Sequence, residues 1–145
     1  MKKIIKIGLI LIVIIASCHN QLEPETIVNE FMRAIVEADL ERAKKVVVQE
    51  QWEKLEILLN NRQPILCKKG NWDDIEISGS GGYSSDSNEW YWNLAYQCAD
   101  PDSPYCIDIR NILLQETDGD WRINDWGNIC ETDDFSYKCG EICKE

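Results

Sequence analysis

The order of apolar and polar positions divides the chain into a helical front half and a strand-forming back half. From Pro24 onward, apolar side chains recur every three or four positions, which is the spacing of one buried helix face. Asp39 is a good N-cap residue, and it begins a second run of the same spacing that continues to the break at residues 60–64. We therefore expect helices between residues 24 and 59. Their buried positions are Ile27, Phe31, Ala34, Ile35 and Ala38, then Leu40, Ala43, Val46 and Val47, then Trp52, Leu55, Leu58 and Leu59.

The back half alternates apolar and polar side chains with a period of two, which is typical of half-buried strands. The pattern predicts an antiparallel meander of about four strands, with a tight turn at "DGD" and a flexible connection at "SGSGGYSSDSN". A short piece containing Trp72, Ile75 and Ile77 is expected to be the first strand. The residues expected on the buried faces of the others are Trp90, Trp92, Leu94, Tyr96 and Cys98, then Tyr105, Ile107, Ile109 and Leu113, then Trp121, Ile123 and Asp125.

Helices followed by an antiparallel sheet predict an α+β fold, in which N-terminal helices pack on a curved sheet. Two segments resemble the nuclear transport factor two-like, or cystatin-like, domains of bacterial lipoproteins. "ETIVNEFMRAIVEADLERAKKVV" is similar to their opening helices, and "LLQETDGDWRINDW" is similar to their closing hairpin. The resemblance implies a sheet curled into a cone around the long helix. The short first strand and the cysteine-rich tail depart from that pattern.

The first seventeen residues have the features of an export signal. Three lysines precede the apolar run Ile7–Ile15, which is too short to span a bilayer. The tetrad Ile15-Ala16-Ser17-Cys18 resembles the lipobox of bacterial lipoproteins, which implies removal of residues 1–17 and lipidation of Cys18. The alternative is an ordinary cleaved signal, with Cys18 in a disulfide.

The resemblance to a lipobox predicts a membrane-anchored exported protein with a short tether, residues 18–23. His19 stands where inner-membrane retention signals have Asp, so we expect the outer membrane or the cell surface if the host uses that rule. The tether is followed by one globular domain, residues 24–129, and a cysteine-rich C-terminal tail, residues 130–145, packed on that domain.

The charge balance limits the partners of the exported chain. The full sequence has 15 Lys and Arg against 26 Asp and Glu, a net charge of −11. Removing residues 1–17 takes away three Lys and leaves 12 cations, for a net charge of −14. This excess of acid argues against a nucleic-acid partner, which would need cations to displace counterions from phosphates. It also argues against adhesion to anionic lipid, so the acyl chains would have to supply the membrane attachment.

Six cysteines remain after Cys18, an even set that predicts up to three disulfides in an oxidising compartment. We expect a link between Cys98 and Cys106 across the turn that they flank. We also expect one tail cysteine to reach Cys67 and the other two to close a small loop. The tail cysteines are Cys130, Cys139 and Cys143.

A zinc site made by the three tail cysteines is the alternative to these disulfides. It is less favoured, because their spacing is not that of zinc ligands and His19 on the tether is the one histidine of the chain. We therefore expect no metal and no cofactor.

Three residues are the candidates for chemistry inside a cone: Asp125, with Tyr96 and Asp108 on neighbouring strands. A buried Asp beside a Tyr donor suits proton abstraction next to a carbonyl. Against this, Asp125 lies near a strand end where water would solvate it, and Asp108 with Arg110 fits an exposed ion pair. The sequence therefore favours a non-catalytic binding or envelope-accessory module for a protein or small-molecule ligand. An isomerase-like or dehydratase-like enzyme using the cone pocket is the alternative.

Six tryptophans are many for this length. Alternation places Trp90, Trp92 and Trp121 in an aromatic core beneath the helices. Trp126 falls on the opposite strand face from Trp121, so we expect it to be exposed. Together with Tyr91 it would form a patch suited to a partner or a ligand.

Overall fold

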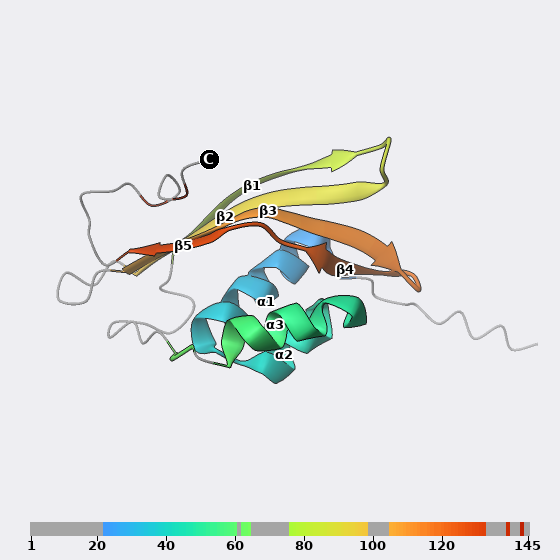
Figure 1. The fold of residues 1–145 in the computed structure, drawn as a ribbon. Helices are drawn as coiled ribbons and strands as arrows, with labels where there is room; N and C mark the ends of the chain where they lie inside the picture. The colour runs from blue at the N-terminus through green and yellow to red at the C-terminus, as the bar shows by residue number, and fades with distance from the viewer. Residues whose placement is uncertain are drawn as a thin grey trace, which may run out of the picture.

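The computed structural model describes residues 22–60, 62–64, 76–98 and 105–132, together with Cys139 and Cys143. Within these ranges the chain forms three α-helices, one short 3-10 helix and a five-stranded antiparallel sheet, so the predicted α+β class is confirmed. The helices all lie on one side of the sheet (Figure 1). The helices are α1 (Pro24–Glu37), α2 (Leu40–Val46), η1 (Gln49–Gln51) and α3 (Trp52–Leu59), and the strands are β1 (Glu76–Ser84), β2 (Glu89–Cys98), β3 (Tyr105–Thr117), β4 (Asp120–Asp125) and β5 (Ile129–Thr132).

The helix α1 forms the centre of the core. Pro24 occupies its first turn, where the missing N–H costs no hydrogen bond. Ala38, which we expected in the buried stripe, instead ends the helix in a left-handed conformation with φ 53°. Asp39 then caps α2 as predicted, because its side chain accepts a hydrogen bond of 2.9 Å from the backbone N–H of Arg42. The buried face of α1 is wider than the predicted stripe and consists of Ile27, Val28, Phe31, Met32, Ala34, Ile35 and Val36.

The sheet has the order β1-β2-β3-β4, and β5 pairs with the first half of β3. The long strand β3 therefore pairs with β4 along its second half and with β5 along its first half. Between them, the N–H of Gly127 donates to the carbonyl of Arg110 at 2.8 Å, which keeps the chain beside β3. A Cβ at Gly127 would lie 2.9 Å from that carbonyl, so the close approach requires glycine.

The first strand differs from the sequence prediction. Residues 78–84, expected within a flexible connection, belong to β1 and pair with β2 without interruption. The aromatic side chains of β2 cover the glycines of β1: a Cβ at Gly81 would lie 2.3 Å from the ring of Trp92. Glycine in this strand therefore makes room for a neighbouring aromatic ring. Trp72 and Ile75, which we expected in the first strand, lie outside the described residues.

Two extra residues interrupt the alternation of the strands. Trp92 pairs with Ile112 but Leu94 pairs with Ile109, so β3 carries an additional residue opposite β2 at Arg110 and Asn111. Asn111 has φ 52°, and its N–H donates to the side-chain oxygen of Asn93 at 2.9 Å. Each such bulge shifts the following residues to the other face of the sheet.

The bulge in β3 explains which of its residues are buried. Ile107 and Ile109 before it, and Ile112 and Leu114 after it, are all fully buried. Leu113, expected to share a face with Ile109, therefore lies on the other side of the strand and is only half-buried.

A second bulge in β4 corrects two predictions. Leu114 pairs with Ile123 but Leu113 pairs with Asp125, so Asn124 is the extra residue. Trp126, not Asp125, consequently continues the buried face of β4. Trp126 is 4 % exposed, and its ring lies 5.3 Å from the ring of Phe31, so the prediction that it is an exposed aromatic is wrong.

The core is mainly aliphatic. Trp90, Trp92 and Trp121, expected to fill it, are half-buried and pack against it from the side. In the part of the chain that the structure describes, no helix has the length and apolar character needed to cross a membrane.

The buried position of Trp126 predicts a large loss of stability on truncation. Trp126→Ala should lower the free energy of unfolding by about 3–5 kcal/mol, the usual cost of removing a buried aromatic ring. Tyr91→Ala, at a half-exposed ring on β2, should cost less than about 1 kcal/mol. Urea denaturation of the two variants measures the difference. Equal costs would show that Trp126 is not packed on Phe31.

Candidate functional site

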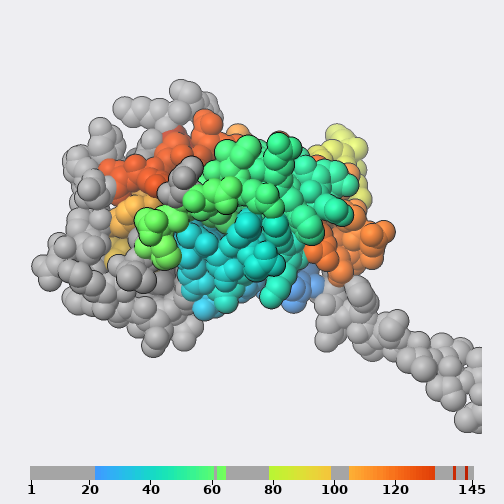
Figure 2. All heavy atoms as spheres, turned by 60° about the horizontal axis from the view of Figure 1, so that its bottom comes forward, coloured from blue at the N-terminus to red at the C-terminus, as the bar shows by residue number. Residues whose placement is uncertain are grey.

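A groove of about 680 Å³ lies between the start of α1, the end of α2 and the start of β4. Its volume is in the range of small-molecule sites. Ile27 and Val46 form an apolar floor, and the half-buried Trp121 forms one wall. Leu22, 51 % exposed, stands at the edge where the described chain begins. Figure 2 shows the blue start of α1 beside the cyan α2 and the orange β3–β4 turn.

The backbone brings two of the groove's cations together. Val47 forms a parallel bridge with Ile123, and the N–H of Val48 donates to the carbonyl of Ile123 at 2.9 Å. This contact fixes the end of α2 against β4. The guanidinium of Arg122 then donates to the backbone carbonyl of Lys45.

The three cations around the groove are compensated unequally. Arg42 is paired with Glu37, and its Nε lies 3.8 Å from Glu30. Arg122 lies 3.9 Å from a carboxylate oxygen of Asp120. Lys45 has no ion-pair partner among the described residues. The groove therefore carries positive charge at the Lys45 side of its rim, in a strongly acidic protein.

These groove residues were not among the sequence candidates. Leu22, Arg42, Lys45 and Arg122 come from the first described residue, α2 and β4, and nothing local in the sequence places them together. The available signal was the concentration of cations in "LERAKKV", which is unusual in so acidic a chain.

Asp125 does not lie in an apolar interior. Its Oδ1 accepts a 2.6 Å hydrogen bond from the ammonium of Lys54 in α3, and its side chain is 49 % exposed. The same ammonium donates to the carbonyl of Trp126 at 2.7 Å and lies 4.3 Å from the centre of its ring. The hydrogen bond from Lys54 holds the pKa of Asp125 below its usual value of 3.8. Asp125 is therefore placed to hold α3 on the sheet rather than to accept a proton from a carbon acid.

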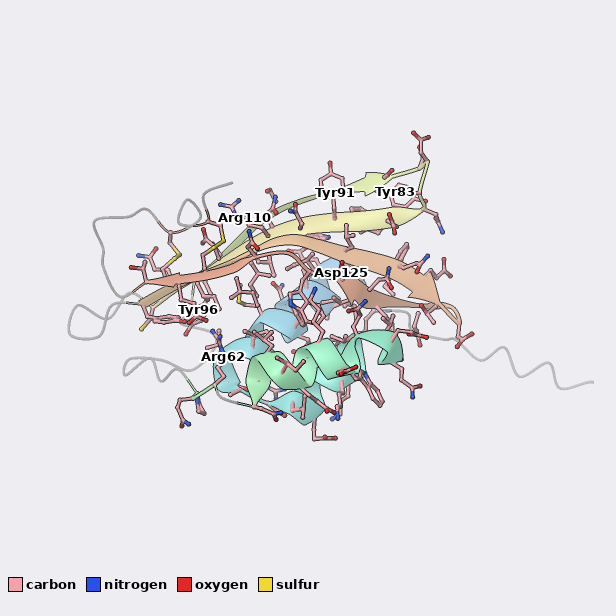
Figure 3. All side chains as sticks on the ribbon, viewed as in Figure 1. Arg62, Tyr83, Tyr91, Tyr96, Arg110 and Asp125 are labelled. Carbon is pink, nitrogen blue, oxygen red and sulfur yellow. A yellow bond between two sulfur atoms is a disulfide. The ribbon has the colours of Figure 1, made fainter. Side chains whose placement is uncertain are left out.

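Tyr96 is fully buried and lies far from Asp125 along the sheet (Figure 3). It pairs with Ile107, whereas Asp125 pairs with Leu113, and six residues of strand span roughly 20 Å. Burial raises the pKa of the Tyr96 hydroxyl, and Glu37 adds to the effect. Burial also raises the pKa of Tyr105 to about 12, against the opposing influence of Arg62. Both phenols are protonated near neutral pH.

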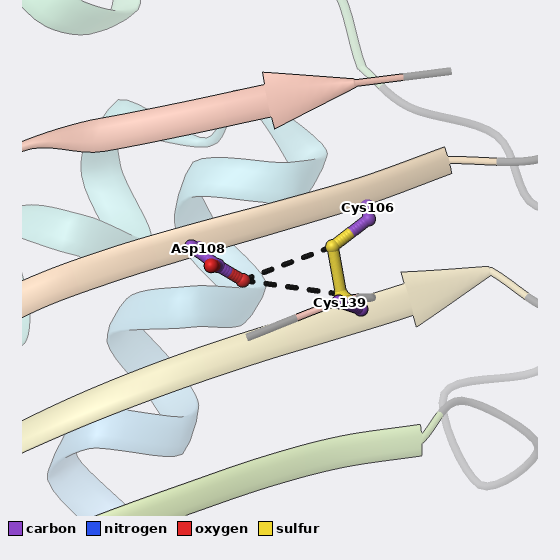
Figure 4. Close-up of side chains that lie close together, drawn as sticks. All are labelled: Cys106, Asp108 and Cys139. Carbon is purple, nitrogen blue, oxygen red and sulfur yellow. Dashed lines mark hydrogen bonds between the residues drawn. A yellow bond between two sulfur atoms is a disulfide. The ribbon is translucent and has the colours of Figure 1, made fainter. Parts of the chain in front are cut away.

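Asp108 lies on the opposite face of the sheet from Tyr96, beside the disulfide between Cys106 and Cys139. We expected Asp108 and Arg110 to form an exposed ion pair. Arg110 does lie 3.4 Å from Oδ2 of Asp108, but Asp108 is fully buried, so the predicted exposure is wrong. Its Oδ1 is 3.7 Å from the sulfur of Cys106 and 3.9 Å from that of Cys139 (Figure 4). These three groups lie close enough to share a metal ion, but the two sulfurs are bonded to each other and so are not thiolate ligands.

The described disulfides differ in part from the predicted pairs. Cys106 is bonded to Cys139, and Cys130 to Cys143, so the expected small loop between two tail cysteines is confirmed. The expected Cys98–Cys106 link is wrong. Cys98 pairs in register with Tyr105, so Cys106 faces the other side of the sheet.

All three tail cysteines have partners other than Cys67, so the link predicted between the tail and Cys67 is also wrong. Cys98 is disulfide-bonded too, to a partner outside the described residues. Cys67 also lies outside them. Cys139 and Cys143 are thus each bonded to a strand residue on the sheet face opposite the helices.

Comparison of the chain with protein-family models, with curated proteins and with solved structures finds no match in any of the three.

The Lys54–Asp125 contact predicts a pH-dependent part of the stability. A carboxyl with a lowered pKa in the folded state contributes stability that is present above its unfolded pKa of about 3.9 and is lost as the pH falls through the folded pKa. Asp125→Asn should therefore be less stable than the parent at pH 7 and equal to it near pH 2. Lys54→Met should remove the same pH-dependent part. A difference between Asp125→Asn and parent that persists unchanged to pH 2 in urea titrations would contradict this account.

The disulfide pairs predict two specific cross-linked peptides. Proteolysis without reduction, followed by mass spectrometry, should recover Cys106 joined to Cys139 and Cys130 joined to Cys143. Replacing the first pair by alanine should cost about 3–4 kcal/mol and the second about 3 kcal/mol, because they are separated by 33 and 13 residues. Recovery of a Cys98–Cys106 peptide would overturn the assignment.

Proposed function

We propose that the chain is a lipid-anchored exported protein whose α+β domain is a non-catalytic binding module of the nuclear transport factor two-like kind. The observation that carries this proposal is the groove between α1, α2 and β4, which has an apolar floor, a cationic rim and the size of a ligand site. Its lining offers binding groups without a paired acid and base of the kind that catalysis next to a carbonyl requires.

The packing beneath the sheet supports a binding site at the surface rather than inside a cone. The side chains of α1 pack against the inner face of β2, β3 and β4. The inner residues Leu94, Tyr96, Ile107, Ile109, Ile112, Leu114 and Ile123 are each at most 3 % exposed. A substrate between α1 and the sheet would have to displace this core. The curved sheet over a long helix is the arrangement that the family resemblance implies.

The alternative enzyme depends on Asp125, Tyr96 and Asp108 acting together. Asp125 is bound to Lys54, Tyr96 is buried far along the sheet, and Asp108 lies on the other face. Nothing in the described contacts brings a proton acceptor beside a proton donor in a hollow. The arrangement of these residues therefore favours the binding module.

The anchor is supported by the sequence Ile15-Ala16-Ser17-Cys18 directly after an apolar run of signal length. The groove begins at Leu22, four residues beyond Cys18. A lipid on Cys18 would hold the groove close to the membrane surface, at most about 15 Å of extended chain away. The destination that we propose is the outer membrane or the cell surface.

Intact mass tests the anchor directly. Protein extracted from membranes should exceed the mass of residues 18–145 by the acyl groups, and Cys18→Ser should move the protein to the soluble exported fraction. Asn20→Ser, a substitution just after the tetrad that breaks no disulfide, serves as the control and should leave the protein in the membrane. A mass equal to that of unmodified residues 18–145 would refute the anchor and leave the groove untouched.

A further inference from the structure

The lining of the groove has three cationic side chains and two carboxylates, whereas the chain as a whole has a net charge of −11. Arg42, Lys45 and Arg122 line it together with Glu30 and Asp120. Within the described residues, the carboxylates of Glu30 and Asp120 lie toward the two arginines, and Lys45 is left without an ion pair. A site with one cation that lacks an ion pair attracts an anion. Because the protein as a whole is acidic, its surface in general repels anions, and the attraction is confined to the groove.

The side chain of Arg122 is held at the rim by a contact with the backbone of α2. One nitrogen of its guanidinium donates to the carbonyl of Lys45, so the side chain is held across the end of α2. The guanidinium thereby contacts the backbone of Lys45, whose side chain lines the same groove and has no ion pair among the described residues. A carboxylate can accept hydrogen bonds from a guanidinium and an ammonium that line the same groove.

Apart from Thr26, the rest of the lining is apolar, and the groove is open to water on one side. Leu22 is 51 % exposed, although it stands at the edge of a floor made by Ile27 and Val46 and beside Trp121. An aliphatic chain laid on this floor would cover Leu22 and remove apolar surface from water. The cations and the apolar lining are thus complementary to a ligand that has an anionic group at one end and an aliphatic chain at the other.

We propose that the groove binds a small amphipathic carboxylate, with its aliphatic chain on Leu22, Ile27 and Trp121 and its carboxylate between Lys45 and Arg122. This inference rests on the proposed binding function and names the class of its ligand. Lys45 and Arg122 supply the charge-assisted hydrogen bonds, and Leu22 supplies exposed apolar surface that the aliphatic chain covers.

The test uses the full chain in nanodiscs of zwitterionic lipid and three probes of equal chain length: octanoate, 1-octanol and octyltrimethylammonium. Isothermal titration, corrected for empty nanodiscs, should give one octanoate bound per chain, with tighter binding than either other probe. Raising the salt concentration should weaken the binding of octanoate and not that of octanol.

Matched variants separate the charge from the apolar contact. Lys45→Gln and Arg122→Gln should each weaken octanoate binding about tenfold, as the loss of a charge-assisted hydrogen bond does. Lys44→Gln, at the neighbouring lysine that is paired with Glu56, should stay within about twofold. Leu22→Ser should weaken binding about threefold, and Ile57→Ser, at an exposed residue of α3, should leave it unchanged.

The outcomes distinguish the ligand class from the binding role. Equal binding of all three probes, with sensitivity to Leu22→Ser alone, would overturn the carboxylate assignment while the groove remained a binding site. Equal effects of Lys45→Gln and Lys44→Gln would overturn it as well. If no probe binds above the level of empty nanodiscs, both the ligand class and the proposed binding function of the groove are refuted.

Discussion

The structure depends on two additional residues in its strands, one in β3 at Arg110 and Asn111 and one at Asn124 in β4. Each reverses which side chains face the helices, and each increases the local bend of its strand. Together they allow the sheet to remain apolar toward α1 along its whole length. Figure 1 shows the strands passing over the helices with this curvature. Without the extra residue in β4, Trp126 would leave Phe31 and a carboxylate would take its place in the core, at a large desolvation cost.

Different parts of the sheet make three different sets of structural contacts. The inner face packs against α1, the outer face near Asp108 carries the disulfide between Cys106 and Cys139, and Asp125 binds α3 through Lys54. Asp108 and Asp125, two of the candidates for chemistry in a cone, are therefore engaged in structural contacts. The groove formed by α1, α2 and β4 differs, because Lys45 at its rim has no ion pair among the described residues.

Local features of the fold could be predicted from the sequence, and the features set by long-range register could not. The apolar spacing of α1 and the cap at Asp39 are properties of neighbouring residues, and both were predicted. The prediction for the strands assumed uninterrupted alternation, so it failed after each bulge, at Leu113 and at Trp126. Asn111 offered a weak signal, because Asn adopts positive φ more readily than most residues. The Cys98–Cys106 pairing failed for the related reason that register, not proximity in sequence, decides which face a side chain takes.

The bulge at Asn124 sets the register of β4 and so removes Asp125 from the interior. Nuclear Overhauser contacts between the strands measure this register directly. We expect backbone contacts that pair Leu114 with Ile123 and Leu113 with Asp125, together with contacts between the rings of Trp126 and Phe31. Contacts that pair Ile112 with Asp125, as in an uninterrupted ladder, would contradict this register and return the carboxylate of Asp125 to the inner face of the sheet.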